Sequence, residues 1–192
     1  MFKMKPNNRN EAGFTLVEIA IVMVIIGLLI GGILKGQAMI QNAKVKRVVK
    51  QADELRAAVM SFYDKYGVYP GDEAKAPIPS GGADNEGDGD GQIEVAEQYE
   101  VYNDLGLAGL ISGSYNGTSD LPNHAFGDNV TLYWVDPGPG TAKHNFLFYN
   151  LPAEVCLEID AKHDDSVWNT GSIVGSAAYT DGTTVPTLYM LF

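Results

Sequence analysis

One stretch decides the fold of this chain: Gly13-Phe14-Thr15-Leu16-Val17-Glu18-Ile19-Ala20-Ile21-Val22. From Ile19 to Leu34 every residue is apolar or glycine. A helix from Phe14 to Leu34 would reach about 31 Å at about 1.5 Å per residue, which is long enough to cross a bilayer. Glu18 is the exception, because an ionisable group inside such a helix costs roughly 2.5 kcal/mol or more. A carboxylate there indicates a function and needs a partner.

The residues before this run indicate its orientation and its processing. Lys3, Lys5 and Arg9 precede the apolar residues, and the positive-inside bias keeps such an end cytoplasmic. Ordinary secretory signals carry a small-residue cleavage site after the apolar region, and none is obvious here. A cut between Gly13 and Phe14 would instead leave the apolar helix in the product and create a new, charged amino terminus at Phe14.

These residues resemble the type IV pilins and the pseudopilins of type II secretion. The likeness lies in a short basic leader that ends in Gly13, then Phe14, then Glu18 as the fifth residue after the cut, then a long apolar run. It is specific from Gly13 to about Gly36 and weaker to about Pro70. In that family a prepilin peptidase cuts after the glycine and methylates the new amine, and the subunits pack their apolar helices into a filament.

The resemblance implies an α+β, pilin-like fold, in which a long helix is covered over its second half by a small antiparallel sheet. It also implies that Glu18 pairs with the amine of Phe14, in its own subunit or the next one. The partners it implies are a prepilin peptidase, an inner-membrane assembly platform and further copies in a helical filament. A plain signal-anchor helix with an accidental glutamate is the alternative.

The chain divides into four expected segments. Residues 1–13 form a leader, 14–36 a transmembrane and filament-core helix, 37–70 the amphipathic second half of that helix, and 71–192 an acidic globular domain. Before assembly the subunit would be anchored in the inner membrane and in contact with lipid, with its domain in the periplasm. Afterwards it would lie in a periplasmic or extracellular filament.

The helix pattern itself supports assembly. Beyond Leu34 apolar residues recur at three- and four-residue steps as far as Tyr66, before Gly67 as a C-cap and Pro70. A helix from Phe14 to Tyr66 would be about 80 Å long. No small domain can bury all of it, so its first half must lie in lipid or against other copies.

Charge and cysteine content exclude some functions. After Pro70 the chain has three basic and nineteen acidic residues, which argues against nucleic-acid binding through this domain. Cys156 is the single cysteine, so no intrachain disulfide can form. Many type IV pilins close their C-terminal loop with a disulfide. Its absence favours a pseudopilin, or a pilin held together by other means.

Two features of the helix have alternative interpretations. Gly27, Gly31, Gly32 and Gly36 weaken the helix and are typical of close packing in membranes, although local melting on assembly is also possible. A basic cluster lies just beyond the membrane segment, at Lys44, Lys46, Arg47, Lys50 and Arg56. It is a solvated face, or it attracts anionic lipid headgroups before assembly and acidic domains of neighbouring copies afterwards.

The globular domain has further predicted elements. A short helix is expected from Val95 to about Leu105 and another from Leu151 to Ala161, with Pro152 in its first turn. Four strands are expected, at residues 130–135, 145–149, 172–179 and 187–192, the last two joined at Asp181-Gly182.

The loop before the first of these short helices resembles a calcium site. Starting the EF-hand template at Glu86 gives the ligand positions to Glu86, Asp88, Asp90, the Gln92 carbonyl, Glu94 and Glu97, with Gly91 at the tight turn. Glutamate in the first position and the lack of an entering helix depart from the template. A register starting at Asp84 would place Val95 last and lose the bidentate ligand. The alternative is a flexible acidic loop.

Other polar groups give weaker signals. Asp160, Asp164 and Asp165 favour a capping or turn role over a metal, and His124, His144 and His163 lack metal spacing. No nucleophile motif is present, so the sequence does not predict an enzyme. The expected function is a filament subunit, of either an extracellular pilus or a periplasmic secretion pseudopilus. A membrane-anchored, calcium-dependent binding module that does not polymerise is the alternative.

Overall fold

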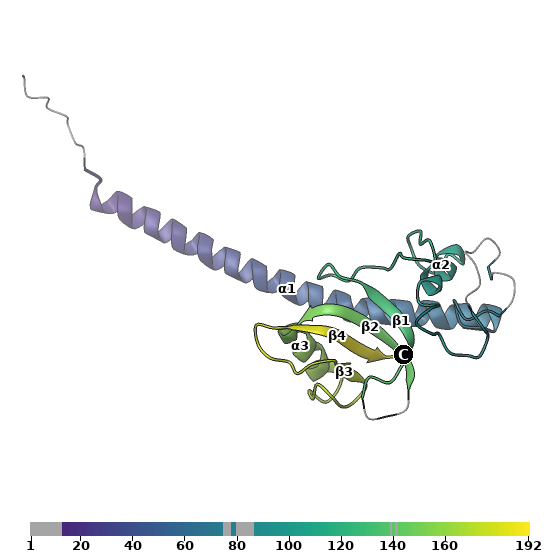
Figure 1. The fold of residues 1–192 in the computed structure, drawn as a ribbon. Coiled ribbons are helices and arrows are strands. Elements are labelled where there is room, and N and C mark those ends of the chain that lie inside the picture. The colour runs from purple at the N-terminus through teal and green to yellow at the C-terminus, as the bar shows by residue number, and fades with distance from the viewer. Residues whose placement is uncertain (1–12, 75–77, 80–86, 139, 141) are drawn as a thin grey trace, which may run out of the picture. The chain divides into compact units, whose positions relative to one another are not determined.

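A computed structural model describes residues 13–74, 78–79, 87–138, 140 and 142–192. It has the predicted α+β, pilin-like fold: one long helix and a small antiparallel sheet (Figure 1). The chain divides into two compact units, Met1–Asn42 and Ala43–Phe192.

Helix α1 runs from Leu16 to Tyr66, 51 residues, close to the predicted Phe14 to Tyr66. In the first unit it forms the described residues 16–42, and its side chains there lie almost entirely in solvent. It ends as the sequence predicts, because Gly67 has a φ of 78° and its N–H donates to the carbonyl of Tyr63 at 2.8 Å. A single such bond from a left-handed residue is a common helix C-cap.

The sheet belongs to the second unit and contains four antiparallel strands in the order β1-β2-β4-β3. The strands are β1 (Val130–Val135), β2 (Lys143–Pro152), β3 (Ile173–Gly175) and β4 (Thr184–Leu191). The bounds predicted for β1 are confirmed. The strand predicted at 172–179 was too long, because the pairing with β4 ends at Gly175 and the Thr187 N–H then bonds to the Ser176 hydroxyl instead of a backbone carbonyl.

The two short helices begin later than predicted. Helix α2 spans Glu100–Leu107, because the residues before it form turns in which Glu97 N–H bonds to the Glu94 carbonyl and Glu100 N–H to the Glu97 carbonyl. Helix α3 spans Ala153–His163. Pro152 is therefore not in its first turn. It ends β2, opposite Thr184 of β4.

One hydrophobic core holds the second unit together. It joins the buried stripe of α1 to side chains from every strand and from α2 and α3. Its largest fully buried members include Phe62, Tyr102, Phe146, Phe148 and Leu188. Burying such side chains contributes about 1.5–3 kcal/mol each, so the second half of α1 is tied to the sheet by packing. The domain is thereby positioned without a disulfide.

Candidate functional site

The start of α1 is capped by its own side chains. The Thr15 hydroxyl accepts the Glu18 backbone N–H at 3.3 Å, and the Glu18 carboxylate accepts the Thr15 backbone N–H at 2.8 Å. The Thr15 hydroxyl also donates to that carboxylate, at 2.7 Å. This reciprocal arrangement is a capping box, in which a threonine and a glutamate three residues later satisfy free helix N–H groups. The carboxylate of Glu18 therefore has two donors in the single chain.

The predicted processing residues lie in an accessible segment. Gly13 and Phe14 precede the helix in non-helical backbone, and Phe14 is 84% exposed. Residues 1–13 precede Phe14 in this chain, so the nitrogen of Phe14 is a peptide group and not an amine. The pairing of Glu18 with a Phe14 amine stays a prediction.

The first half of α1 leaves its apolar side chains uncovered. None of the most apolar window of this helix is buried, and by length and composition the helix could cross a membrane. Leu16, Met23 and Leu28 are each more than two-thirds exposed. Gly27, Gly31, Gly32 and Gly36 have open space where a side chain would lie. A contiguous apolar surface of this kind marks an interaction with protein or lipid.

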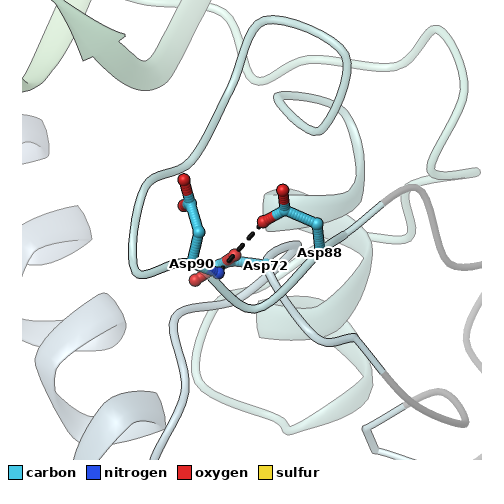
Figure 2. Close-up of side chains that lie close together, drawn as sticks. All are labelled: Asp72, Asp88 and Asp90. Carbon is cyan, nitrogen blue, oxygen red and sulfur yellow. Dashed lines mark hydrogen bonds between the residues drawn. The ribbon is translucent and has the colours of Figure 1, made fainter.

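A second candidate site lies where the Gly-rich loop meets the end of α1. The carboxylates of Asp72, Asp88 and Asp90 come within 4.8 Å of one another (Figure 2). Asp72 is buried, whereas Asp88 and Asp90 are exposed. Three carboxylates that converge from two segments offer the hard oxygen ligands that calcium prefers.

Backbone hydrogen bonds hold this group in place. Asp72 accepts the N–H groups of Gly89 and Gly91, both at 3.0 Å, one on each carboxylate oxygen. Asp88 accepts the Asp90 N–H at 3.0 Å, as Figure 2 shows. A Cβ on Gly87 would lie 2.6 Å from the Glu73 nitrogen, so only glycine allows this approach. The loop is therefore wrapped closely against the segment that contains Asp72.

The remaining predicted ligands are arranged differently. Gln92 donates its backbone and side-chain N–H groups to Asp90, at 2.8 and 2.9 Å. Glu97 is buried and accepts the Glu94 N–H at 2.7 Å, and neither Glu94 nor Glu97 belongs to the group of three. Glu86 lies outside the described residues. The EF-hand assignment as a whole stays a prediction.

Asp72 was missed by sequence reasoning, because it precedes Asp88 by sixteen positions and follows no ligand template. Its one signal is the pair Asp72-Glu73, two acids that follow Pro70 and Gly71 shortly after the end of α1. In the structure both side chains are buried, each 2% exposed, so the pair places two carboxylates in the interior of the unit.

The electrostatics of the loop favour a cation. Burial raises the pKa of Asp72, and the charges of Asp90 and Asp88 add to the rise, although the N–H groups of Gly91 and Gly89 oppose it. Burial also raises the pKa of Glu97 to about 7. No lysine or arginine pairs with these four acids among the described residues. A divalent cation would relieve their repulsion.

The second acidic group has the predicted capping and turn contacts. Asp160 accepts the Ser166 N–H, Asp164 the Ile173 N–H, and Asp165 the Val167 N–H, at 2.9, 2.8 and 2.8 Å. The three carboxylates also lie within 4.8 Å of one another. Their hydrogen bonds fold the segment after α3 onto the start of β3.

Comparison with known proteins identifies relatives of the chain. Residues 8–34 match the family described as the prokaryotic N-terminal methylation motif. The type IV major pilin protein PilE of Neisseria gonorrhoeae is 31% identical over 167 residues, which are 86% of this chain and 90% of that protein. The type IV major pilin protein PilE1 of Neisseria gonorrhoeae is 27% identical over 160 residues, 81% of this chain and 92% of that protein. No solved structure gives a significant match.

Proposed function

Because this chain belongs to the type IV pilin family, we propose that it is a structural subunit of a type IV pilus, processed and polymerised through its N-terminal helix. A prepilin peptidase cuts between Gly13 and Phe14, and the mature chain is held in the inner membrane by the first half of α1. From there an assembly platform moves it into a helical filament of identical copies. The role is structural, with no chemistry of its own.

The exposed apolar half of α1 carries this proposal. The side chains from Phe14 to Leu34 have no partner surface within the described chain. A bilayer covers these apolar side chains before assembly, and the same helix of neighbouring copies covers them in a filament. A binding module that never polymerises would need only the bilayer, and the carboxylate of Glu18 would then serve only as a helix cap inside an apolar segment, where a charge is unfavourable.

The names of the relatives favour a pilus over a secretion pseudopilus, since both are called type IV major pilins. The lone, buried Cys156 had favoured a pseudopilin. The core that joins α1, the sheet and α3 offers the other means of holding a pilin domain together, so the lack of a disulfide is compatible with a pilus.

Purification of surface filaments tests the proposal. The expected result is sheared filaments that contain this chain, with a mature amino terminus at Phe14 that is methylated. A bulky Gly13→Leu substitution should leave the chain uncut and in the membrane. Uncut chains in wild-type cells, or filaments that lack the chain, would overturn the proposal in favour of the binding module.

The acidic loop has a separate, structural role in this proposal. Calcium would bind Asp72, Asp88 and Asp90 and would fix the loop against the end of α1, close enough to Glu97 that the charges of Asp72 and Asp88 raise the pKa of that acid. The fit rests on converging carboxylates, a buried Asp72 and the close approach at Gly87. The ion would supply charge neutralisation and rigidity in a domain whose single cysteine cannot form an intrachain disulfide.

A further inference from the structure

Helix α3 bears a small acidic groove that lies apart from the start of α1 and from the Gly-rich loop. Leu157, Ala161 and Tyr179 contribute apolar surface to the lining of the groove, and Leu157 is 42% exposed. The acids Glu154, Glu158 and Asp181 also line it. The volume of about 320 Å³ is at the lower end for ligand pockets, so it suits one or two long side chains.

The charges of the groove are not balanced within the described chain. Glu158 pairs with Lys162, and Glu154 accepts the Gly182 N–H at 2.7 Å. Neither Glu154 nor Asp181 has an ion-pair partner among the described residues. An exposed leucine beside uncompensated carboxylates fits a lysine, whose methylene stem packs on apolar surface while its head meets the acids.

The opposite imbalance lies on α1. Lys44, Lys46, Arg47 and Lys50, here called the basic row, hold four of the thirteen Lys and Arg of the chain in seven residues, and all four are exposed. Glu54 accepts both Arg47 and Lys50, at 2.9 and 3.1 Å, so one carboxylate serves two cations. Lys46 has no ion-pair partner within the described residues.

We propose that the acidic groove of α3 receives the basic row of a second copy of this chain, with Lys46 and Lys50 packed over Leu157 and paired with Glu154 and Asp181. This inference rests on the proposed filament function and adds a contact between globular units. Lys46 and Lys50 are four residues apart and so share one face of the helix. Among the described residues, the acidic groups at Asp72 and at Asp160 are clusters of three carboxylates, whereas the groove combines its acids with an exposed leucine.

The two surfaces differ, so the contact is heterologous. A heterologous contact leaves a free groove at one end and a free basic row at the other, and it extends into an open helical array when its rotation does not close. Each contact is weak, but a filament repeats it at every subunit, and repetition multiplies its effect.

Charge reversal in the full-length chain tests the proposal. Lys46→Glu with Lys50→Glu reverses the row, and Glu154→Lys with Asp181→Lys reverses the groove while leaving the Glu158–Lys162 pair. Each reversal should lower the filament yield, by about fivefold for every ion pair lost. The four changes together should restore the yield to near wild type. Asp64→Lys with Asp120→Lys, two exposed acids outside the groove, changes the net charge equally and should have little effect.

A yield that stays low in the combined variant, or falls equally in the control, would overturn the docking while leaving the filament function intact. A row variant that is inserted in the membrane but assembles poorly, and that the groove reversal does not rescue, would instead assign the row to anionic lipid. A cysteine pair, Lys46→Cys with Leu157→Cys, gives a reading independent of filaments. Oxidation of membranes should yield a ladder beyond the dimer, whereas each single change should stop at the dimer. The native Cys156 is buried and serves as background.

If wild-type cells form no filaments, the filament proposal fails by itself. The ladder then still decides the docking: its presence supports the contact between copies, and its absence with both cysteines in place refutes the contact.

Discussion

The carboxylate of Glu18 accepts both the backbone N–H and the hydroxyl of Thr15, at 2.8 and 2.7 Å. Glu18 is therefore not an unsatisfied charge in the single chain, because it caps its own helix. The proposed cut between Gly13 and Phe14 would add a positive amine at Phe14, one residue before this cap. The capping box already holds the Glu18 carboxylate toward the helix end at which this positive charge would appear.

The first prediction separates capping from assembly. Glu18→Ala should remove filaments while leaving cleavage and membrane insertion, because an unpaired amine in the filament core costs about 3 kcal/mol or more, over a hundredfold in equilibrium. Thr15→Val keeps the carboxylate and its bond from the Thr15 N–H, and it removes the two contacts of the hydroxyl. It should cost about 1 kcal/mol and preserve filaments. The measurement is the filament yield of each variant, together with the amino-terminal sequence of its subunits. If Glu18→Ala forms as many filaments as Thr15→Val, Glu18 has a capping role alone.

The second prediction concerns calcium and distinguishes two ligand sets. The mature chain in detergent should melt about 5–10 °C higher with calcium at a hundredfold excess over its dissociation constant than with chelator. Asp72→Asn should abolish this difference, since Asp72 belongs to the converging group. Glu94→Gln should preserve it, since Glu94 does not.

The reverse pattern, with Glu94 needed and Asp72 dispensable, would support the EF-hand register. Identical melting temperatures of the wild-type chain with calcium and with chelator would show that this loop does not bind calcium.

The sequence predicted what rests on local pattern. Helix α1 and strand β1 were placed closely because continuous periodicity, a glycine cap and β-branched residues determine them locally. Helix α2 was placed too early, because the buried carboxylate of Glu97 turns back to the Glu94 N–H, and a residue pattern does not reveal such a turn.

The candidate cation site was predicted only in part, for a related reason. Asp88 and Asp90 are recognisable from their spacing with glycine. Asp72 joins them through the way the loop folds back, and that depends on the close approach of Gly87 to the backbone of Glu73. Contacts between segments distant in sequence follow from packing, which a single sequence does not display.

The third prediction is a loss of stability at alkaline pH. Burial and the charge of Glu73 raise the pKa of Asp104 to about 8, and its carboxylate accepts the Gly71 N–H at 2.7 Å. Because the folded pKa exceeds the unfolded value of 3.8, the contribution is fully present below about pH 4 and is lost as the pH rises through about 8.

Asp104→Asn imitates the protonated acid and keeps an acceptor for Gly71. With chelator present, the variant should be more stable than wild type at pH 9, by about 1–3 kcal/mol, and its stability should depend less on pH. Denaturant unfolding at pH 6 and pH 9 measures both. Parallel pH profiles for the two proteins would show that Asp104 does not titrate in this range.

The last prediction is a loss of stability at acidic pH through His144. The Nε2 atom of His144 accepts the Ile93 N–H at 2.9 Å, while the Ile93 carbonyl accepts the Trp134 N–H, so Ile93 anchors the end of the acidic loop to the sheet. Burial lowers the pKa of His144 to about 4, although the charge of Asp90 opposes this. Since the folded pKa lies below the unfolded value of 6.5, stability is lost as the pH falls from about 6.5 toward 4.

His144→Gln keeps an acceptor that does not titrate, so this variant should lose less stability than wild type between pH 7 and pH 5. His144→Phe leaves the buried N–H of Ile93 without an acceptor, so it should be less stable than wild type by about 1–3 kcal/mol at both pH values. Protease cleavage of the loop at the two pH values follows the same equilibrium, and a His144→Gln variant as acid-sensitive as wild type would contradict the role of this ring.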